Sequence, residues 1–247
     1  MRTVISKTYH ISTFVWYTFL TSILLSKDPK ELPQGLFVYG GPWKYLTFLN
    51  LVLQMVFFGL AALSDFQLPY MKGKAKKLHL WKDLLFSVLA FPVGSFVVMV
   101  FWGMFMYDRQ LVYPDNLDGF FPPWINHAMP PSAHGVCDFS CQIFCNQTVA
   151  GLQKISVLPL LAVEIVLHPH AYPKKQNGLA TLGIIGVGYL TWVIWIYLTV
   201  GVWVYPVLGK FTPAGLAYFF LFNMSVVEAL YLFGETLNCY IWGKFQL

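Results

Sequence analysis

The chain has 247 residues, of which 57% are hydrophobic and 11% are charged, and its formal net charge is +5. Globular domains carry roughly 25% charged residues, and a soluble domain of this length cannot bury so much apolar surface in one core. The composition therefore excludes an ordinary soluble domain, and because the lysines lie between apolar runs rather than along a basic face, it gives no sign of nucleic-acid binding.

The first apolar run, residues 9–26, follows Arg2 and Lys7, as in a secretory signal peptide. The small-residue cleavage site of such a peptide is not evident near residues 22–26. Bulky aromatic residues fill the run and suit a retained span. We therefore expect an uncleaved first transmembrane helix.

Four further apolar runs are long enough to cross a bilayer, which needs about 20 residues per helix. They predict transmembrane helices at residues 46–64, 84–106, 179–204 and 214–234. A sixth span would join residues 124–129 to residues 157–167 if the stretch between them were absent. The predicted fold class is all-α: a polytopic transmembrane helical bundle that forms one multi-pass domain over residues 1–247.

Residues 130–156 interrupt the sixth span as an atypical insertion. The stretch opens with two prolines and holds three of the four cysteines. In an oxidising compartment these cysteines would form one disulfide and leave an odd thiol, and with one histidine they offer four zinc ligands. Their spacing matches no established zinc pattern, so we favour an irregular insertion with incidental cysteines and expect no metal site. The residues concerned are Cys137, Cys141, Cys145 and His134.

The loops predict how the chain is oriented in the membrane. If all six spans cross, both termini and the loops at 65–83 and 168–178 lie on one side, and this side carries most of the lysine and arginine residues. Because basic residues favour the cytoplasmic side, both termini of this integral membrane protein are predicted to be cytoplasmic. Residues 130–156, with the N-glycosylation sequon at Asn146, would then lie on the lumenal or extracellular side.

Polar residues inside the apolar spans are candidate functional groups, because burying them in lipid is costly. Thr47, Asn50 and Gln54 occur at i, i+3 and i+7, so they share one face of a helix. Such a stripe either holds helices together or presents a nucleophile with polar support.

Carboxylates form a second group of polar residues in the spans. The last span carries a stripe that contains two glutamates on one face, and a third glutamate lies in the interrupted span. These carboxylates either relay protons or stay neutral and hydrogen-bonded. A solute transporter would use them along an aqueous path. The residues are Ser225, Glu228, Glu235 and Asn238 in the last span and Glu164 in the interrupted one.

Histidine is the usual general base for a hydroxyl nucleophile. His127 lies at the head of the interrupted span, at a membrane depth similar to that of Thr47. His168 and His170 end this span on the opposite side, roughly 30 Å away across the bilayer, and so are poor partners for Thr47. The nearby Pro173 favours a loop role for both.

Six motifs occur in order along the chain, at residues 43–47, 89–93, 113–114, 124–129, 203–206 and 231–238. Together they are similar to the motifs of the androgen-induced membrane protein family. Tyr9-His10 and residues 167–173 point to one branch of this family. The resemblance covers nearly the whole chain except residues 130–156.

The resemblance implies an integral membrane hydrolase that cleaves fatty acid esters of hydroxy fatty acids, with a lipid ester as substrate and no metal or organic cofactor. In the family the nucleophile is a threonine that corresponds to Thr47, and we expect Asn50 as a supporting polar contact. The family's histidine directly follows the motif that ends at Met129, where this chain has Pro130; counted from the far side of the insertion, the position falls near Lys154. A positioned base contributes roughly 10²–10⁴-fold in rate. The alternative is therefore a non-catalytic membrane regulator or an inactive isoform.

Overall fold

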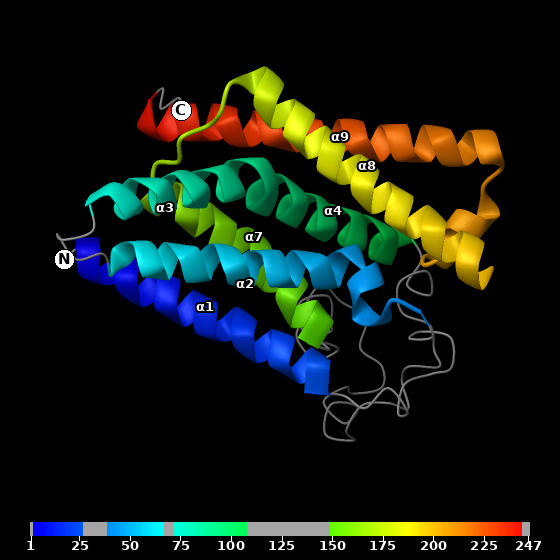
Figure 1. Ribbon diagram of the computed structural model, residues 1–247, viewed down its shortest axis with the longest axis horizontal. Helices are drawn as coiled ribbons and strands as arrows, with labels where there is room; N and C mark the ends of the chain where they lie inside the picture. Colours follow the sequence, from blue (N-terminus) through cyan, green and yellow to red (C-terminus); the bar gives the residue numbers. More distant parts are fainter. Residues whose placement is uncertain (1, 27–38, 67–71, 108–148, 244–247) are drawn as a thin grey trace, which may run out of the picture.

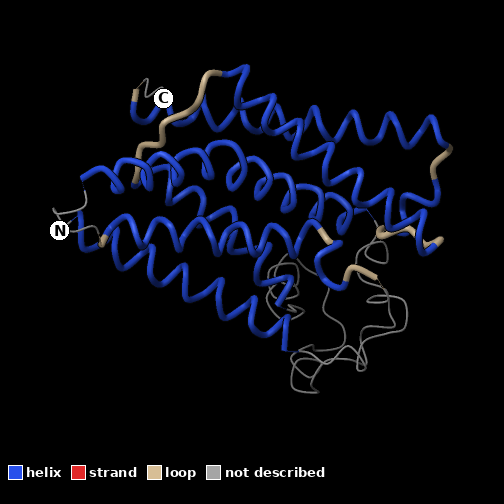
Figure 2. Tube along the Cα trace, in the orientation of Figure 1, coloured by secondary structure: helices blue, strands red, loops and turns tan. Residues whose placement is uncertain are grey.

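The computed structural model describes residues 2–26, 39–66, 72–107 and 149–243, and helices form the regular secondary structure within these ranges (Figure 1; Figure 2). The helices run side by side along the long axis of the molecule (Figure 1). This arrangement confirms the predicted all-α fold of a polytopic membrane protein.

Long helices make up most of the described chain, and short turns join some of them. The long helices are α1 (Arg2–Ser26), α2 (Leu46–Asp65), α3 (Lys72–Leu84), α4 (Phe91–Tyr107), α7 (Val149–Leu167), α8 (Lys175–Val200) and α9 (Pro213–Trp242). The short segments are η2 (Gly41–Lys44), η4 (Leu85–Ala90) and η7 (Pro206–Lys210). Both chain termini lie at one end of the bundle, which we call the terminal end (Figure 1). The opposite end, where α2 begins and α8 ends, is the η2 end.

In the described part of the chain, four helical stretches are long and apolar enough to cross a membrane. They are Leu46–Asp65, Lys77–Gly103, Lys175–Val200 and Pro213–Trp242. Helix α1 covers the predicted first span but is not among them, because its serine, threonine, tyrosine and histidine residues lower its mean hydropathy. It is a partly polar helix that lies along α2 (Figure 1).

Helix α7 begins at Val149, whereas the sequence pattern places the resumption of the sixth span at Val157. The apolar part of this helix, Ser156–Leu167, is shorter than a full span. Residues 124–129, the other half of the predicted sixth span, and residues 130–148 lie outside the described residues.

A π-helical segment joins α3 to α4 in one continuous helical path. This segment, η4, ends two residues before Pro92, whose ring lacks an amide hydrogen and crowds the carbonyl group one turn earlier. A widened turn accommodates the ring. Gln54 of α2 donates a hydrogen bond of 2.9 Å to the carbonyl oxygen of Ala90 and so ties α2 to the widened turn.

An aromatic core fills the space between α1, α2, η4 and α7. Tyr17, Phe57 and Phe86 are fully buried there. At Gly94 of α4 the helices come so close that an added Cβ would lie 2.8 Å from Nε2 of Gln54. A larger residue at this position would therefore displace the Gln54 side chain.

Helices α8 and α9 lie together on one side of α4 (Figure 1). At Gly178 of α8, an added Cβ would overlap the hydroxyl group of Tyr231 in α9. The Tyr231 ring is fully buried and lies 5.7 Å, between centroids, from the ring of Tyr172. This contact fixes the start of α8 against α9.

Candidate functional site

Thr47 lies in the first turn of α2, at the η2 end of the bundle, and its side chain is half-buried. Tyr45 precedes the helix, and its carbonyl oxygen accepts hydrogen bonds of 3.1 Å from the amides of Phe48 and Leu49. The first amide of the helix donates to the hydroxyl group of Tyr205 at 3.0 Å. These bonds hold the start of α2 in place, and with it Thr47.

Asn50 and Gln54, the other members of the polar stripe on α2, are both buried. Gln54 donates a hydrogen bond of 3.2 Å to Oδ1 of Asn50 and also bonds Ala90 of η4. The stripe therefore helps to hold α2 against η4. The Nδ2 group of Asn50 is buried and has no hydrogen-bond partner within the described ranges.

Lys44 lies just before α2, and its side chain is buried. This burial lowers the pKa of its ammonium group. The carbonyl oxygen of Lys44 accepts a hydrogen bond of 3.1 Å from the hydroxyl group of Tyr189. Lys44 also lines a small pocket with Tyr45 and Trp203, although Thr47 is not among the lining residues.

The structure covers only part of the region in which the resemblance places a histidine. Lys154 lies in α7, whereas His127, Pro130 and His134 lie outside the described residues. Each histidine that the structure does describe belongs to the terminal end of the bundle, at the opposite end of α2 from Thr47.

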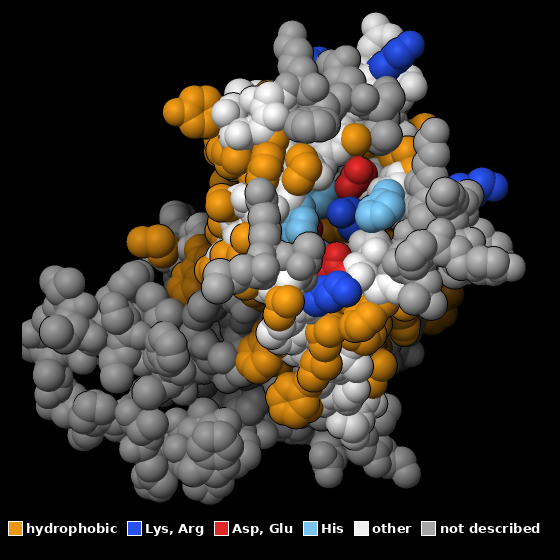
Figure 3. Space-filling model, turned by 90° about the vertical axis from the view of Figure 1, so that its left-hand side faces the viewer, with side chains coloured by type: hydrophobic (Ala, Val, Ile, Leu, Met, Phe, Trp, Pro, Cys, Tyr) orange, Lys and Arg blue, Asp and Glu red, His pale blue; other side chains and the backbone are white. Residues whose placement is uncertain are grey.

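Histidines and carboxylates gather at the terminal end, and we call this group the histidine–carboxylate cluster. Figure 3 shows pale blue histidine and red acidic side chains close together on this face of the molecule. They come from α1, the last residue of α2, α3, α7 and the loop after α7. The members are His10, Asp65, Asp83, Glu164, His168 and His170.

His10 connects two carboxylates in this cluster. Its Nδ1 lies 2.7 Å from Oδ2 of Asp65, and its Nε2 lies 3.0 Å from Oε2 of Glu164. The His10 side chain is 1% exposed and the Glu164 side chain is 0% exposed. Since a buried charge is costly unless it is paired, these contacts explain how α1 and α7 accommodate both groups.

His170 makes a similar pair of contacts from the loop after α7. Its Nδ1 lies 3.1 Å from Oδ1 of Asp83, and its Nε2 lies 3.2 Å from Oε1 of Glu164. The second contact lacks hydrogen-bond geometry, and both of its atoms are buried without a hydrogen-bond partner in the part of the chain that is described. Asn238 of α9 fixes the loop by accepting a bond of 3.1 Å from the His170 amide and donating one of 2.8 Å to its carbonyl oxygen.

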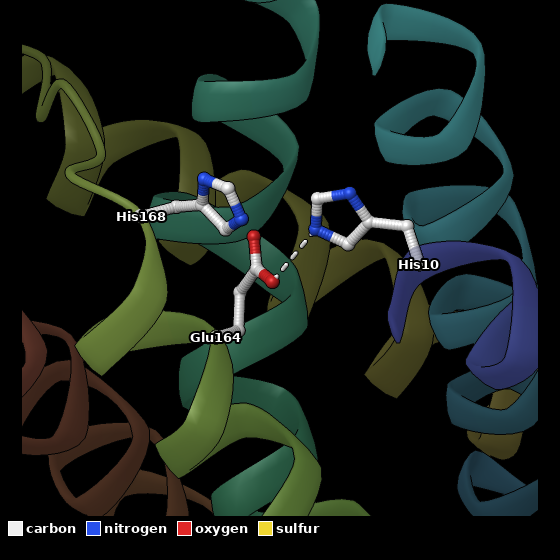
Figure 4. A group of neighbouring side chains, drawn as sticks. All are labelled: His10, Glu164 and His168. Carbon is white, nitrogen blue, oxygen red and sulfur yellow. Dashed lines mark hydrogen bonds and ion pairs between the residues drawn. The ribbon is translucent and has the colours of Figure 1, made fainter. Parts of the chain in front are cut away.

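His168 completes the cluster. Its Nε2 lies 2.9 Å from Oγ of Ser6, and its ring centroid lies 4.8 Å from that of His10. Burial lowers the pKa of His168 to about 4, so its imidazole is neutral at neutral pH. His10, Glu164 and His168 each offer one potential ligand atom, and these atoms all lie within 4.8 Å of one another (Figure 4).

The sequence pattern does not predict this cluster. One signal was present: Glu164 and His168 are four residues apart, and the His168 amide donates to the Glu164 carbonyl at 2.9 Å, so both side chains lie on one helical face. The partners from α1 and α2 left no such signal. The glutamates of the last span do not join the cluster through any described contact; Glu235 instead lies 3.7 Å from Lys175.

The chain is similar to one protein family over most of its length. A family model described as FAR-17a/AIG1-like protein matches residues 5–239. The chain is 37% identical to the androgen-dependent TFPI-regulating protein of Homo sapiens, over 96% of this chain and 94% of the relative. It is 41% identical to the protein of the same name from Rattus norvegicus, over 95% and 92%, and 38% identical to the androgen-induced gene 1 protein of Homo sapiens, over 90% and 86%. No solved structure matches the chain.

Proposed function

Because the chain belongs to the FAR-17a/AIG1-like protein family, we propose that it is an integral membrane hydrolase of fatty acid esters of hydroxy fatty acids, with Thr47 as its nucleophile. The observation that carries the proposal is the position of Thr47. It is half-buried in the first turn of an apolar helix that is long enough to cross a membrane, three residues after a buried lysine. A hydroxyl group in this position can meet an ester whose acyl chains lie in the bilayer.

In the proposed reaction the Thr47 hydroxyl attacks the carbonyl carbon of the ester. Its proton passes to a base, and a tetrahedral oxyanion forms. The bond to the alkoxy oxygen of the hydroxy fatty acid then breaks, and this oxygen takes up the proton. Water attacks the resulting acyl-threonine, which releases the fatty acid and restores the hydroxyl group.

Two features of α2 support stabilisation of the oxyanion. The N-terminal turn of a helix carries a positive partial charge, which favours negative charge that develops beside it. The buried Nδ2 group of Asn50 lies one turn further along and has no hydrogen-bond partner among the described residues. A donor of this kind suits the supporting role that the sequence suggested for Asn50.

Lys44 is the base that we assign within this proposal. The position of the family's histidine holds Pro130 in this chain. A lysine can replace a histidine as the base of a hydroxyl nucleophile, as in hydrolases with a serine–lysine pair. Burial lowers the pKa of Lys44 and so raises the fraction of Lys44 that is present as the neutral amine.

A covalent fluorophosphonate probe tests the proposal. The wild-type protein is expected to be labelled, with mass spectrometry locating the probe on Thr47. Thr47→Ala is expected to lose the label, whereas Thr47→Ser, which keeps a hydroxyl group, is expected to retain it. Persistent labelling of Thr47→Ala would show that a different residue is the nucleophile.

The second candidate function is that of a non-catalytic membrane regulator or an inactive isoform. Proline at the position of the family's histidine favours it. If this candidate function is correct, the fluorophosphonate probe does not label the wild-type protein, whereas it labels the Pro130→His variant. The similar androgen-dependent TFPI-regulating proteins have names that describe regulation rather than catalysis, which is consistent with this candidate.

A further inference from the structure

Two aspartates of the histidine–carboxylate cluster hold histidines in the same way. Asp65 contacts Nδ1 of His10 at 2.7 Å, and Asp83 contacts Nδ1 of His170 at 3.1 Å. In both rings Nε2 then faces the Glu164 carboxylate, at 3.0 Å and 3.2 Å. Histidines that bind metal ions in proteins usually have this arrangement, in which one ring nitrogen donates to a carboxylate and the other faces the ion.

We infer that His10, Glu164 and His168 bind a divalent transition-metal ion of the zinc type. Their three potential ligand atoms lie within 4.8 Å of one another (Figure 4). Zinc bonds to nitrogen and oxygen are about 2.0–2.2 Å long, so ligand atoms around a tetrahedral ion lie roughly 3.3–3.6 Å apart. Nε2 of His10 and Oε2 of Glu164 are already 3.0 Å apart. Rotation of the half-buried His168 ring would bring the third ligand into range.

The types of ligand atom indicate which metal ions the site would bind. Two imidazole nitrogens and one carboxylate oxygen suit zinc and its first-row neighbours, whereas magnesium and calcium prefer sites made of oxygen atoms. His170 or a water molecule can supply a fourth ligand. Both Nε2 of His170 and Oε1 of Glu164 are buried without a hydrogen-bond partner within the described ranges, and a bound cation gives both atoms a partner.

The charge of the cluster also matches a divalent ion. Metal binding requires neutral imidazoles. The three carboxylates, together with the buried ammonium group of Lys82 that lies 3.7 Å from Asp83, then leave a net charge of −2. A divalent ion would balance this charge.

The site is reachable from the terminal end and is separate from Thr47. Asp65 and Asp83 are 19% and 17% exposed, which leaves an approach for an ion. Asp65 is 18 residues after Thr47 on the same helix, a distance of about 27 Å at 1.5 Å per residue. The inference therefore goes beyond the proposed ester hydrolysis and does not depend on it.

Zinc binding to the purified protein, prepared without a polyhistidine tag, tests the inference. After removal of metal, addition of Zn²⁺ and gel filtration, the wild type is expected to retain about one zinc ion per chain. His10→Gln/His168→Gln is expected to lose more than about 100-fold in zinc affinity. His79→Gln, which changes an exposed histidine of α3, is the matched control and should bind like the wild type. Equal binding by the wild type and the double variant, or displacement of zinc by magnesium, would overturn the inference.

Spectroscopy of the wild type covers the case in which the double variant does not fold. X-ray absorption at the zinc edge should show nitrogen and oxygen ligands at about 2.0–2.1 Å, with scattering from imidazole rings. Co²⁺ in place of zinc should give the intense visible absorption of a four-coordinate site. A sulfur shell around zinc, or an oxygen shell without imidazole, would show that these residues do not form the site.

Discussion

The side chains that we propose to carry chemistry lie at opposite ends of the molecule. Thr47 and Lys44 lie at the η2 end, whereas the histidine–carboxylate cluster lies at the terminal end. A general base must come within hydrogen-bond reach of the hydroxyl group that it activates. No histidine within the described ranges meets this condition for Thr47, since α2 separates them by about 27 Å. Lys44, which lies three residues before Thr47, is the base that we propose instead.

Replacement of Lys44 tests this assignment. Lys44→Met and Lys44→Arg both remove the neutral amine, since arginine stays protonated, and we expect labelling of Thr47 to slow by roughly 10²–10⁴-fold. Because the neutral amine is the active form and burial lowers the pKa of Lys44, the wild-type rate should rise with pH and level off below the usual lysine value of about 10.4. Lys210→Met, at an exposed lysine of the same end, is the control. An unchanged rate in Lys44→Met would contradict the role.

Asp65 is expected to position His10 for metal binding rather than to bind the ion itself. Asp65→Asn keeps the size of the side chain but removes the charge that holds Nδ1 of His10, so zinc affinity should fall by roughly 10–100-fold. Titration against a fluorescent zinc indicator measures this change. The neighbouring Ser64→Ala, which loses only a bond to the Ala61 carbonyl within the described contacts, should leave the affinity unaltered. If Asp65→Asn binds zinc as tightly as the wild type, the aspartate does not position the ring.

Buried polar side chains form hydrogen bonds with neighbouring backbone groups at points where the backbone departs from a regular α-helix. Gln54 bonds the Ala90 carbonyl in the π-helical segment, and Asn238 bonds both backbone groups of His170 in the loop after α7. Lipid cannot hydrate a backbone group, so each must find a partner inside the protein. The polar stripes that the sequence showed on α2 and α9 supply these partners, and Asn238 thereby also positions His170 of the histidine–carboxylate cluster.

Three glycines of α8 differ in what an added methyl group would contact. In Gly178→Ala the new methyl group would meet the buried Tyr231, and we expect a loss of about 1–3 kcal/mol in the free energy of unfolding. In Gly186→Ala it would meet only the end of the flexible Met224 side chain, so the loss should be smaller. Gly183→Ala meets no atom within 4 Å and should be neutral or gain up to about 1 kcal/mol from helix propensity. The free energy of unfolding of each variant, measured in mixed micelles, tests this order of losses. Equal losses at all three positions would contradict this packing.

The fold class of the whole molecule was predictable because apolar runs of bilayer length leave few alternatives to a helix. Helix α2, expected at residues 46–64, extends from Leu46 to Asp65. The histidine–carboxylate cluster was not predictable in the same way. Its members come from several helices and a loop, and contacts between distant segments leave no periodic pattern in the sequence. The four-residue spacing of Glu164 and His168 was the only sign of the cluster in the sequence.

The distribution of basic residues predicts how the whole molecule is oriented. Both termini and the lysine-rich α3 lie at the terminal end, which should therefore be cytoplasmic (Figure 1). In a cysteine-free background, His79→Cys on α3 should react with a membrane-impermeant maleimide in sealed microsomes whose cytoplasmic face is outward. Val202→Cys, at an exposed position beyond the end of α8, should react only after detergent opens the vesicles.

This orientation also decides which solution reaches each candidate site. The histidine–carboxylate cluster would take up metal ions from the cytosol, whereas Thr47 would lie toward the lumenal or extracellular face. Glycosylation gives an independent measurement, because Asn146 belongs to the segment between α4 and α7, and both of these helices meet that segment at the η2 end (Figure 1). Asn146→Gln should then abolish an endoglycosidase-sensitive mobility shift. Reaction of Val202→Cys in sealed vesicles, with protection of His79→Cys, would reverse the assignment and place Thr47 toward the cytoplasm.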